Sequence, residues 1–363
     1  MILKQHYDEW LASAIAPSLI EANCYSLTVE PYGARDEAIL FLYQPEEIPR
    51  RNGGHAAHAF LWRHNYLNRG GWVSVGYNLL TGKRSQWGTL KPDTPRWDRD
   101  KNRPRKYEHP RNRPTEIHVP GIPLEIAERW LGKYEGWPEF RDNYAGEELF
   151  TAWAFMLSHP EVPLNITEGN KKTNCLMTHQ GMTIGLAGVW NWIDPQAPRF
   201  YGDNRSSYRE KTITPLLRPL LCQGREVNLW FDEDNQSKTR QNVDTALLAL
   251  GNAIAAYGTQ VRIACWDADQ GKGVDDAIRQ HSPHFLHQIQ WYSLEAYPHQ
   301  QLIETQKKLH SLTYPVNLPL DTSCLPDLSH LIPKSGIINL KSAKASGKSF
   351  QMQIGRASCR ERV

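Results

Sequence analysis

The stretch "VPLNITEGNKKTN", residues 162–174, joins an apolar segment to a polar, lysine-rich one. Val162 to Ile166 has the apolar, β-type character of a buried strand, and Glu168-Gly169 follows almost at once. The next residues, "KKTNCLMTHQG", have the pattern of a helix that ends at Gly181. The sequence therefore predicts a carboxylate at the tip of a buried strand, with a glycine beside it and a helix starting just after.

Apolar strands and glycine-closed helices continue to alternate after this stretch. The predicted strands are "MTIGLAGV", "EVNLWF" and "QVRIACW". The predicted helices are "ITPLLRPLLCQG", closed by Gly224, and "NVDTALLALGNAIAAYG". Such alternation is typical of βαβ units, so we expect an α/β fold with a mostly parallel sheet.

Three of the predicted strands end in acidic residues. Glu168 ends the first, Asp232-Glu233-Asp234 follow the third, and "WDADQGKGVDD", with Asp275 and Asp276, follows the fourth. The carboxyl ends of parallel strands share one edge, where several carboxylates repel unless protons or metal ions neutralise them. Oxygen ligands of this kind suit Mg²⁺ or Mn²⁺.

Each acid also has a simpler interpretation when it is taken alone. The Glu168 carboxylate could interact favourably with the positive end of the dipole of the following helix, and Asp232 or Asp234 could be an N-cap. Capping does not explain "DED" and "VDD" together, so we favour an acidic, metal-binding edge. Asp267 and Asp269 are expected to form a turn rather than to bind metal.

The segment before residue 162 has a less regular pattern. Residues 1–22 have helical spacing, and 38–82 are predicted to form short strands and turns that include "AILFLY". Residues 91–114 contain too many prolines for a regular element, whereas 121–132 and 146–158 are predicted to be helical.

Composition limits the class of protein. A chain of 363 residues predicts two or more domains. Neither an apolar run of about 18 residues nor a secretion signal is visible. The six cysteines include no CxxC pair, which argues against a zinc ribbon and a disulfide framework. We expect a cytoplasmic protein that does not enter a membrane.

Basic and aromatic residues gather between Lys83 and Arg113. This segment holds eleven Lys and Arg against four Asp and Glu, with Trp87, Trp97 and Tyr107 among them. Such a mixture suits single-stranded nucleic acid, because cations follow phosphates and flat rings stack on bases. The alternative is a solvated loop whose aromatic rings pack on the core. The candidate nucleic-acid-binding residues are Trp87, Lys91, Arg96, Arg99, Arg103, Arg105, Lys106 and Arg111.

A second phosphate-binding pattern lies in "GIINLKSAKASGKSF". A predicted strand runs into a segment close to the P-loop pattern G-x-x-x-x-G-K-[ST], in which Ser342 replaces the first glycine and Gly347 is the second. Lys348 would reach the phosphates and Ser349 would bind Mg²⁺. The helix and the metal-binding aspartate that an ATPase also needs do not follow, so we expect no ATP hydrolysis by this chain. We interpret "IGRASCRERV", residues 354–363, as a sequencing-adapter artefact.

Together, "ITEGNKKT", "FDED" and "GKGVDD" resemble a TOPRIM domain, the metal-dependent module of primases and topoisomerases. In this order, "IPRRNGG", "GGWVSVGYNLLTG", "WGTLKPDTPR", "KYEHP", "ITEGNKK" and "FDEDNQSKTRQNV" resemble plasmid replication proteins of cyanobacteria. Those proteins carry a TOPRIM-like domain of unassigned function followed by a P-loop ATPase. The resemblance extends from about residue 8 to 353.

The resemblance implies roles for individual residues. Glu168 would be the general acid/base, and Gly169 would leave room for a phosphate. Asp232 and Asp234 would hold Mg²⁺ or Mn²⁺, with Asp275 and Asp276 as a further acid pair. Two lysines stand near the acidic position of the usual Glu-Gly-x-x-Asp pattern, which implies a smaller metal set and phosphate contacts instead. These are Lys171 and Lys172.

The implied function is plasmid DNA replication by a primase-type, magnesium-dependent domain fused to a helicase-like ATPase that uses ATP. The alternatives are a non-catalytic DNA-binding scaffold and a TOPRIM-type nuclease. The expected partners are DNA, single-stranded or at a plasmid origin, and nucleotides, with an oligomer formed through the ATPase part. The expected domains are a helical start (1–45), a basic α+β region (46–145), the TOPRIM-like domain (146–292), a linker (293–334) and the start of a P-loop domain (335–353).

Overall fold

The computed structural model describes residues 1–27, 33–100, 102–201, 207–234 and 237–310. Residues Met1–Gln300 form one compact unit. Of the second unit, Gln301–Val363, the described residues are those that end helix α11 (Ala296–His310). The predictions about the P-loop (Ser342, Gly347, Lys348 and Ser349), most of the linker and residues 354–363 lie outside the described residues.

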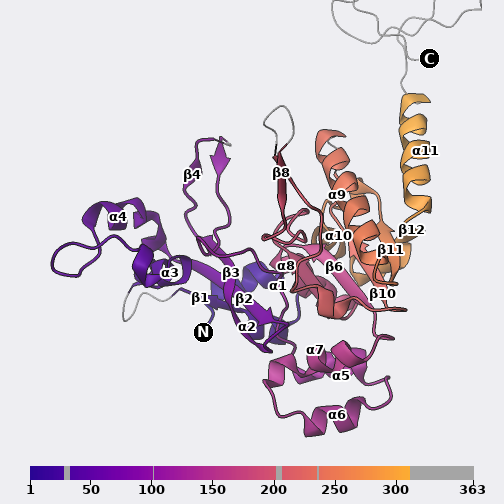
Figure 1. The fold of residues 1–363 in the computed structure, drawn as a ribbon, viewed down its shortest axis with the longest axis horizontal. Helices are drawn as coiled ribbons and strands as arrows, with labels where there is room; N and C mark the ends of the chain where they lie inside the picture. The colour runs from indigo at the N-terminus through magenta and orange to yellow at the C-terminus, as the bar shows by residue number, and fades with distance from the viewer. Residues whose placement is uncertain (28–32, 101, 202–206, 235–236, 311–363) are drawn as a thin grey trace, which may run out of the picture. The chain divides into compact units, whose positions relative to one another are not determined.

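A five-stranded sheet forms the centre of the first unit (Figure 1). The strand order is β12-β11-β10-β6-β7, and all neighbours are parallel except β12, which runs antiparallel to β11. The strands are β6 (Leu164–Glu168), β7 (Thr183–Leu186), β10 (Glu226–Trp230), β11 (Gln260–Cys265) and β12 (Gln290–Ser293). The α/β class and the mostly parallel sheet predicted from the sequence are confirmed.

The helices between these strands pack on the sheet. Helix α8 (Asn170–His179) packs on β6 and β7 and against α10 (Val274–His281), while α9 (Ser237–Ala255) packs on β11. Cys175, Leu176 and Met177 of α8 are fully buried. Because α8 starts one residue after Gly169, its packing fixes the position of the Glu168 strand tip.

The N-terminal part has its own antiparallel sheet, of order β1-β2-β3. Its strands are β1 (Cys24–Ser26), β2 (Gly71–Asn78) and β3 (Lys83–Pro92). Helices α1 (Lys4–Leu11), α2 (Pro17–Asn23), α3 (Ala34–Leu42) and α4 (His58–Arg63) accompany it. A separate hydrophobic cluster, which includes Ile39, Phe60 and Val73, lies under α3 and α4.

A short extended segment, residues 117–119, connects the two sheets through backbone hydrogen bonds. His118 and Gly185 exchange N–H to O=C bonds of 2.7 and 2.8 Å, which places the segment beside the edge strand β7. On the other side, the Tyr77 N–H of β2 donates to the Val119 carbonyl at 2.7 Å. The small sheet is therefore joined to the strand next to β6.

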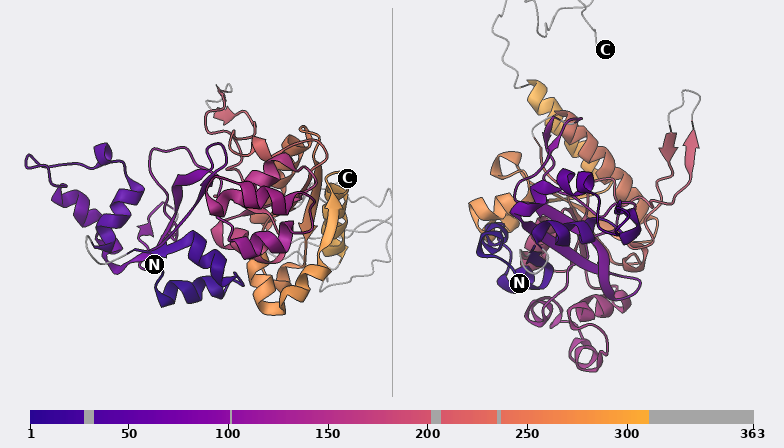
Figure 2. Two further views of the ribbon diagram at one scale, coloured as in Figure 1. Left: turned by 90° about the horizontal axis from the view of Figure 1, so that it is seen from below. Right: turned by 90° about the vertical axis from the view of Figure 1, so that its left-hand side faces the viewer.

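The remaining elements surround these sheets. Helices α5 (Leu124–Leu131), α6 (Trp137–Asn143) and α7 (Thr151–Ser158) lie together below the sheet in Figure 1. The hairpins are β4 (Trp97–Asp98) with β5 (Arg103–Pro104), and β8 (Arg199–Tyr201) with β9 (Ser207–Arg209), of which the second projects clear of the unit in Figure 2. Short 3-10 helices span Pro45–Glu47, Asn65–Arg69, Glu148–Phe150, Arg218–Leu220, Ala268–Gln270 and Pro283–Gln288.

Two of the predicted elements are wrong. The segment "AILFLY" is not a strand but belongs to α3, because Ala34, Ala38 and Leu42 recur at helical spacing and are buried together. The segment "ITPLLRPLLCQG" is not a helix and has a single 3-10 turn, Arg218–Leu220. Pro219 has no N–H and obstructs a regular helix at this point.

Helix α8 approaches strand β7 closely at Gly185, and a substitution there tests this packing. A Cβ on this residue would lie 2.2 Å from Thr173 Oγ1 and 3.3 Å from the Gly169 carbonyl oxygen. We therefore expect Gly185→Ala to push the start of α8 away from the sheet and to cost about 1–3 kcal/mol of unfolding free energy. Urea unfolding measures the change.

Gly53→Ala is the matched control, because the nearest atom to an added Cβ there is 3.8 Å away and the residue is exposed. Its unfolding midpoint should equal that of the wild type. Equal midpoints for both variants would contradict the close approach of α8 to β7.

Candidate functional site

Two acidic residues lie side by side where β6 and β10 end. The register pairs Thr167 with Trp230, so Glu168 and Asp232 follow at neighbouring strand ends. Burial raises the pKa of Glu168, the Asp232 carboxylate raises it further, and the Lys172 and Lys272 ammonium groups oppose these effects. The Glu168 carboxylate therefore lies in a partly desolvated position close to a second negative charge.

Gly169 provides the turn between Glu168 and α8. Its φ of +82° is in the region that favours glycine, and its N–H donates to the Leu186 carbonyl at 2.8 Å. Its carbonyl accepts bonds from the backbone N–H (3.2 Å) and the hydroxyl (2.7 Å) of Thr173. A Cβ on Gly169 would meet nothing within 4 Å, so the space beside Glu168 is open.

Lysines pair with both aspartates that the sequence predicts as metal ligands. The Lys172 ammonium donates to Asp232 Oδ1, and the Lys272 ammonium lies 2.6 Å from Asp234 Oδ2. Burial alone would lower the pKa of Lys172, but the Asp232, Glu168 and Asp275 carboxylates outweigh this effect and raise it. Lys172 is therefore held as a cation among three carboxylates.

The "GKGVDD" segment contributes one carboxylate to this cluster. Burial raises the pKa of Asp275, and Asp276 and Asp232 add to the increase. The Gly273 backbone lies against the cluster, since a Cβ there would be 2.7 Å from Asp275 Oδ1 and 3.2 Å from Lys172 Cδ. Asp276 is half-exposed and pairs with Arg279 at 3.6 Å, so the structure does not bring it into the cluster.

The other acids near these strand ends have structural partners. Buried Glu233 pairs with Arg240, which also contacts Asp244 Oδ1 at 2.9 Å. Asp267 Oδ1 accepts the Asp269 N–H at 3.0 Å and caps a 3-10 turn, as expected for a turn. The cluster that remains consists of Glu168, Lys172, Asp232 and Asp275, and we refer to it as the Glu168 cluster.

The Glu168 cluster does not fit a divalent metal ion in this conformation. Among the described residues, no three His, Cys, Asp or Glu side chains are arranged to hold one. The oxygen ligands are of the kind that Mg²⁺ and Mn²⁺ prefer, yet the Asp232 and Asp234 carboxylates each face a lysine ammonium. The predicted metal ligands are thus present, but their charges are already balanced.

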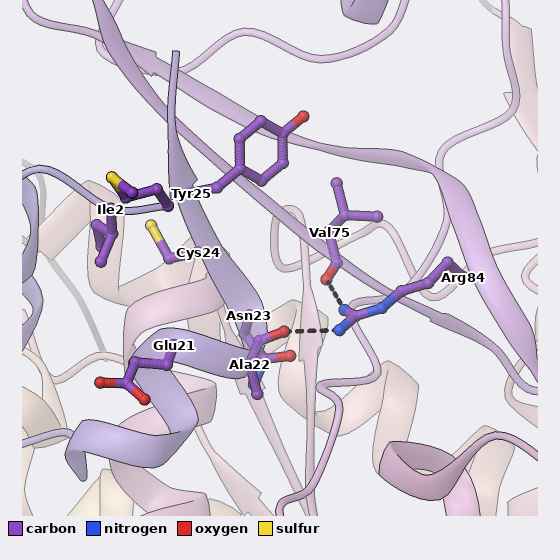
Figure 3. Close-up of a pocket in the computed structure, with 9 residues that line it drawn as sticks. Ile2, Glu21, Ala22, Asn23, Cys24, Tyr25, Val75 and Arg84 are labelled. Carbon is purple, nitrogen blue, oxygen red and sulfur yellow. Dashed lines mark hydrogen bonds between the residues drawn. The ribbon is translucent and has the colours of Figure 1, made fainter. Parts of the chain in front are cut away.

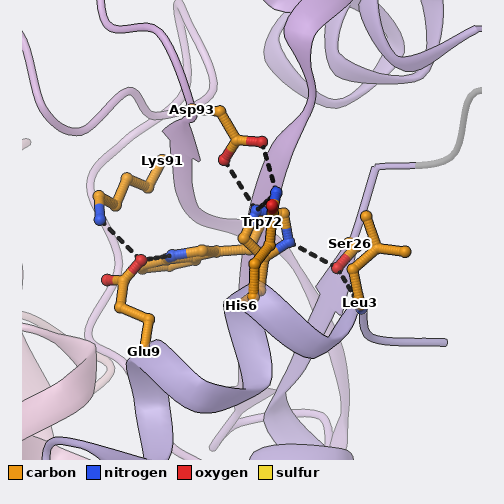
Figure 4. A network of polar contacts seen from close by, with 8 residues as sticks. Leu3, His6, Glu9, Ser26, Trp72, Lys91 and Asp93 are labelled. Atoms are coloured by element: carbon orange, nitrogen blue, oxygen red, sulfur yellow. Dashed lines mark hydrogen bonds and ion pairs between the residues drawn. The ribbon is translucent and has the colours of Figure 1, made fainter.

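The other lysine at the start of α8, Lys171, forms an ion pair with Glu9 of helix α1. Glu9 accepts from Lys91 Nζ (2.7 Å) and Trp72 Nε1 (3.1 Å), as Figure 4 shows, and lies 3.2 Å from Lys171 Nζ. Burial would raise the pKa of Glu9, but Lys91, Lys171 and Trp72 together lower it. Lys171 is therefore directed to Glu9, whereas Lys172 is directed to Asp232.

The same part of the structure contains a serine, a histidine and an aspartate that are linked one to the next by hydrogen bonds (Figure 4). His6 Nδ1 lies 2.7 Å from Ser26 Oγ, and His6 Nε2 lies 2.7 Å from Asp93 Oδ1. Ser26 is 2% exposed, and its oxygen also accepts the Leu3 N–H at 2.7 Å. A substrate carbonyl has no access to this hydroxyl, so the arrangement ties α1 to the small sheet.

A pocket of 480 Å³ lies apart from the Glu168 cluster, between α2, β1 and β2 (Figure 3). Arg84 lines it and donates to the Val75 carbonyl (3.0 Å) and the Ala22 carbonyl (2.7 Å). Burial raises the pKa of the Cys24 thiol, which keeps the thiol protonated. The Arg84 guanidinium and the Asn23 amide in this pocket are therefore committed to the fold.

The basic segment divides into anchored and exposed residues. Trp87 is 4% exposed and stacks on His109 at 4.8 Å, so its ring is not open to a base. Four cations have partners in the fold: Lys91 with Glu9, Arg96 with Glu108, Arg105 with Asp98, and Arg111 over the Tyr43 ring. The exposed basic and aromatic residues in the β4–β5 hairpin and directly after it include Trp97, Arg99, Arg103, Lys106 and Tyr107.

Three residues near the Glu168 cluster were missed by the sequence reasoning. Buried Asn170, the first residue of α8, has a side-chain N–H₂ group without a partner among the described residues. Lys272 pairs with Asp234. Burial raises the pKa of Tyr107, Glu9 and Asp275 add to the increase, and the Tyr107 ring lies 6.1 Å from that of Trp72. All three lie in motifs quoted from the sequence, Asn170 in "ITEGNKKT", Tyr107 in "KYEHP" and Lys272 in "GKGVDD", but no pattern in these motifs indicated a role for them.

Part of the chain matches a family of unassigned function. Residues 152–285 match a family described as "Domain of unknown function (DUF3854)". Over 358 residues the chain is 34% identical to an uncharacterised protein of Picosynechococcus sp.. That match covers 96% of this chain and 33% of the other protein, so the chain spans about a third of the length of this relative.

The structure has a distant likeness to a crystal structure of the Aquifex aeolicus primase (zinc-binding and RNA polymerase domains). The TM-score is 0.42 at 10% sequence identity, with 84% of this chain and 59% of that chain covered. A likeness of this size does not define a shared fold or function. Within the described ranges, none of the helices combines the length and apolar character needed to cross a bilayer.

The pKa of Glu168 leads to a test of stability against pH. A carboxyl group with a raised pKa in the folded protein costs folding free energy once it ionises, so stability falls as the pH rises from about 4 through the folded-state pKa. Glu168→Gln removes this cost. We expect its Tm to exceed that of the wild type by a few degrees at pH 7, with no advantage below pH ~4.

Glu161→Gln is the matched control, because Glu161 is exposed in the loop before β6. Its Tm should follow that of the wild type at both pH values in differential scanning calorimetry. A Glu168→Gln variant that is less stable than the wild type at pH 7 would show that the ionised carboxylate is favoured in the fold, contrary to this account.

Proposed function

We propose that this chain is the primase-like part of a plasmid DNA replication protein, in which a TOPRIM-like domain acts on DNA by nucleotidyl transfer. The observation that carries the proposal is the convergence of Glu168 and Asp232 at adjacent ends of parallel strands, with a lysine between them. Ligands of open α/β sheets bind at this edge. The motif resemblance supplies the reaction class, because the family match assigns none.

Within this proposal Glu168 moves a proton at the reacting oxygen. A raised pKa brings the proton exchange of a carboxyl group closer to neutral pH than that of an ordinary glutamate, which suits a general acid/base. The open space beside Gly169 leaves room for a phosphate, and the N–H groups at the start of α8 favour an anion. The unpartnered Asn170 amide is a further donor at this position.

We include Mg²⁺ or Mn²⁺ in the assay, but we do not propose a site at which the ion binds. When bound, such an ion would stabilise charge on the transferring phosphoryl group. Because lysines already pair with Asp232 and Asp234, we assign no step of the reaction to a metal ion. ATP use by a downstream ATPase remains a prediction on residues outside the described ranges.

The β4–β5 hairpin is the proposed contact for single-stranded DNA. Trp97 is 58% exposed, and the exposed cations Arg99, Arg103 and Lys106 belong to the same hairpin or directly follow it. The Arg105–Asp98 ion pair (3.0 Å) holds the hairpin together, and the ring of Tyr107, which follows it, lies 6.1 Å from that of Trp72. Trp72 donates to Glu9, which pairs with Lys171 at the start of α8. Single-stranded DNA whose bases stack on Trp97 would therefore run in the direction of Glu168.

A DNA-binding scaffold without catalysis is the second candidate function. The observation that favours it is that lysines neutralise both predicted metal ligands, Asp232 and Asp234. A TOPRIM-type nuclease is a third reading, and the same assay separates all three.

The assay incubates the whole chain with single-stranded template, nucleotides and Mg²⁺ or Mn²⁺. We expect primer synthesis that falls by about 10²-fold or more in Glu168→Gln, because general acid/base catalysis typically contributes 10²–10⁴-fold. Glu161→Gln should retain wild-type synthesis. Template cleavage that depends on Glu168 would replace the primase with the nuclease, and DNA binding with neither reaction would replace it with the scaffold.

Single-strand binding tests the hairpin by fluorescence anisotropy. We expect Trp97→Ala to weaken binding of an oligothymidylate about tenfold at every salt concentration, because a stacked base contributes about 1–3 kcal/mol. Arg103→Ala should weaken binding and reduce the salt slope by about one, because it removes one phosphate contact.

Trp62→Ala is the matched control, since Trp62 is 77% exposed on α4, away from the hairpin. Its binding should equal that of the wild type. Equal binding by Trp97→Ala and the wild type would remove the hairpin from the proposed path of the strand.

A further inference from the structure

Lys172 occupies the centre of the Glu168 cluster. Its side chain is 16% exposed and starts in the first turn of α8, and its ammonium donates to Asp232 Oδ1. Gly273 closes the other side, because a Cβ there would lie 3.2 Å from Lys172 Cδ and 3.6 Å from Asp232 Oδ1. The lysine is therefore enclosed between α8 and the loop that precedes α10.

The charges around Lys172 make its ammonium difficult to replace. Glu168, Asp232 and Asp275 all act on this one cation, and they raise its pKa although burial opposes them. Lys171, the neighbouring lysine, is directed elsewhere and pairs with Glu9. Lys172 is thus the positive charge that allows three partly buried carboxylates to lie together.

A divalent ion at Asp232 would meet this ammonium. The ammonium already donates to Asp232 Oδ1, and two cations within about 4 Å on one carboxylate repel by several kcal/mol at a partly desolvated site. The described part of the chain offers no alternative group of three acidic, histidine or cysteine ligands. The donor set therefore disagrees with the metal site that the motif resemblance implies.

We propose that Lys172 is the resident cation of the Glu168 cluster and takes the place of a divalent metal ion there. The inference deepens the proposed function at the same site. The inference has a second part, in which the Lys172 ammonium also contacts the phosphate of an incoming nucleotide or DNA strand. Only this second part rests on the proposed function. The first part concerns cation binding alone.

Titration of the whole chain with Mn²⁺, followed by electron paramagnetic resonance of the free ion, tests the first part. The wild type should bind Mn²⁺ weakly, and Lys172→Met should bind it about tenfold more tightly, because the carboxylates lose their internal cation. Lys171→Met is the matched control and should bind as the wild type does. Lys172→Arg keeps the charge and should also remain weak.

The folded state of each variant is checked by near-UV circular dichroism. If Lys172→Met does not fold, the wild type and Lys172→Arg still decide, because tight Mn²⁺ binding by either overturns the inference. Equal Mn²⁺ affinity of the wild type and a folded Lys172→Met also overturns it.

The second part is tested by titrating the wild type and Lys172→Met with inorganic triphosphate in the absence of metal. We expect about a tenfold loss of affinity in the variant. Unchanged affinity removes the phosphate role. These readouts do not depend on primer synthesis, so the inference and the proposed function can fail separately.

Discussion

The repulsion between carboxylates at one edge of a parallel sheet is the constraint on which the rest of the site depends. The register of β6 and β10 places Glu168 and Asp232 next to each other, and α10 adds Asp275. Burial makes the negative charges harder to tolerate, which is why the pKa values of Glu168 and Asp275 rise. Lys172 supplies the compensating charge from the first turn of α8.

Much of the surrounding fold fixes the position of α8 and of its two lysines. Gly185 lets the helix start approach β7, Gly169 allows the sharp turn after Glu168, and Gly273 brings the next loop against Lys172. From the N-terminal part, Glu9 takes up the charge of Lys171. The segment at His118 joins the small sheet to the edge strand beside β6. The site is therefore supported by residues far apart in the sequence.

The parallel sheet could be predicted because its signals are local. Apolar runs repeat between residues 162 and 266, two of the predicted glycine-closed helices are present as α8 and α9, and the ends of parallel strands in such a series share an edge. The sequence could not indicate the partners of the acids, since the Lys172–Asp232 pair joins residues 60 positions apart. For the same reason the sequence left open whether Trp87 stacks on bases or packs on the core, and in the structure it packs on His109. Segment 38–43 was assigned to a strand because it is a continuous apolar run, and its helical spacing appears only when Ala34 is taken together with Ala38 and Leu42.

A double-mutant cycle on Lys172 and Asp232 tests the central claim most directly. The unfolding free energies of the wild type, Lys172→Met, Asp232→Asn and the double variant give the coupling between the two side chains. Both side chains are less than one-fifth exposed, so we expect a coupling energy of about 1–3 kcal/mol. Effects that add to within about 0.5 kcal/mol would contradict the account, because they would mean that Lys172 does not balance the charge of Asp232.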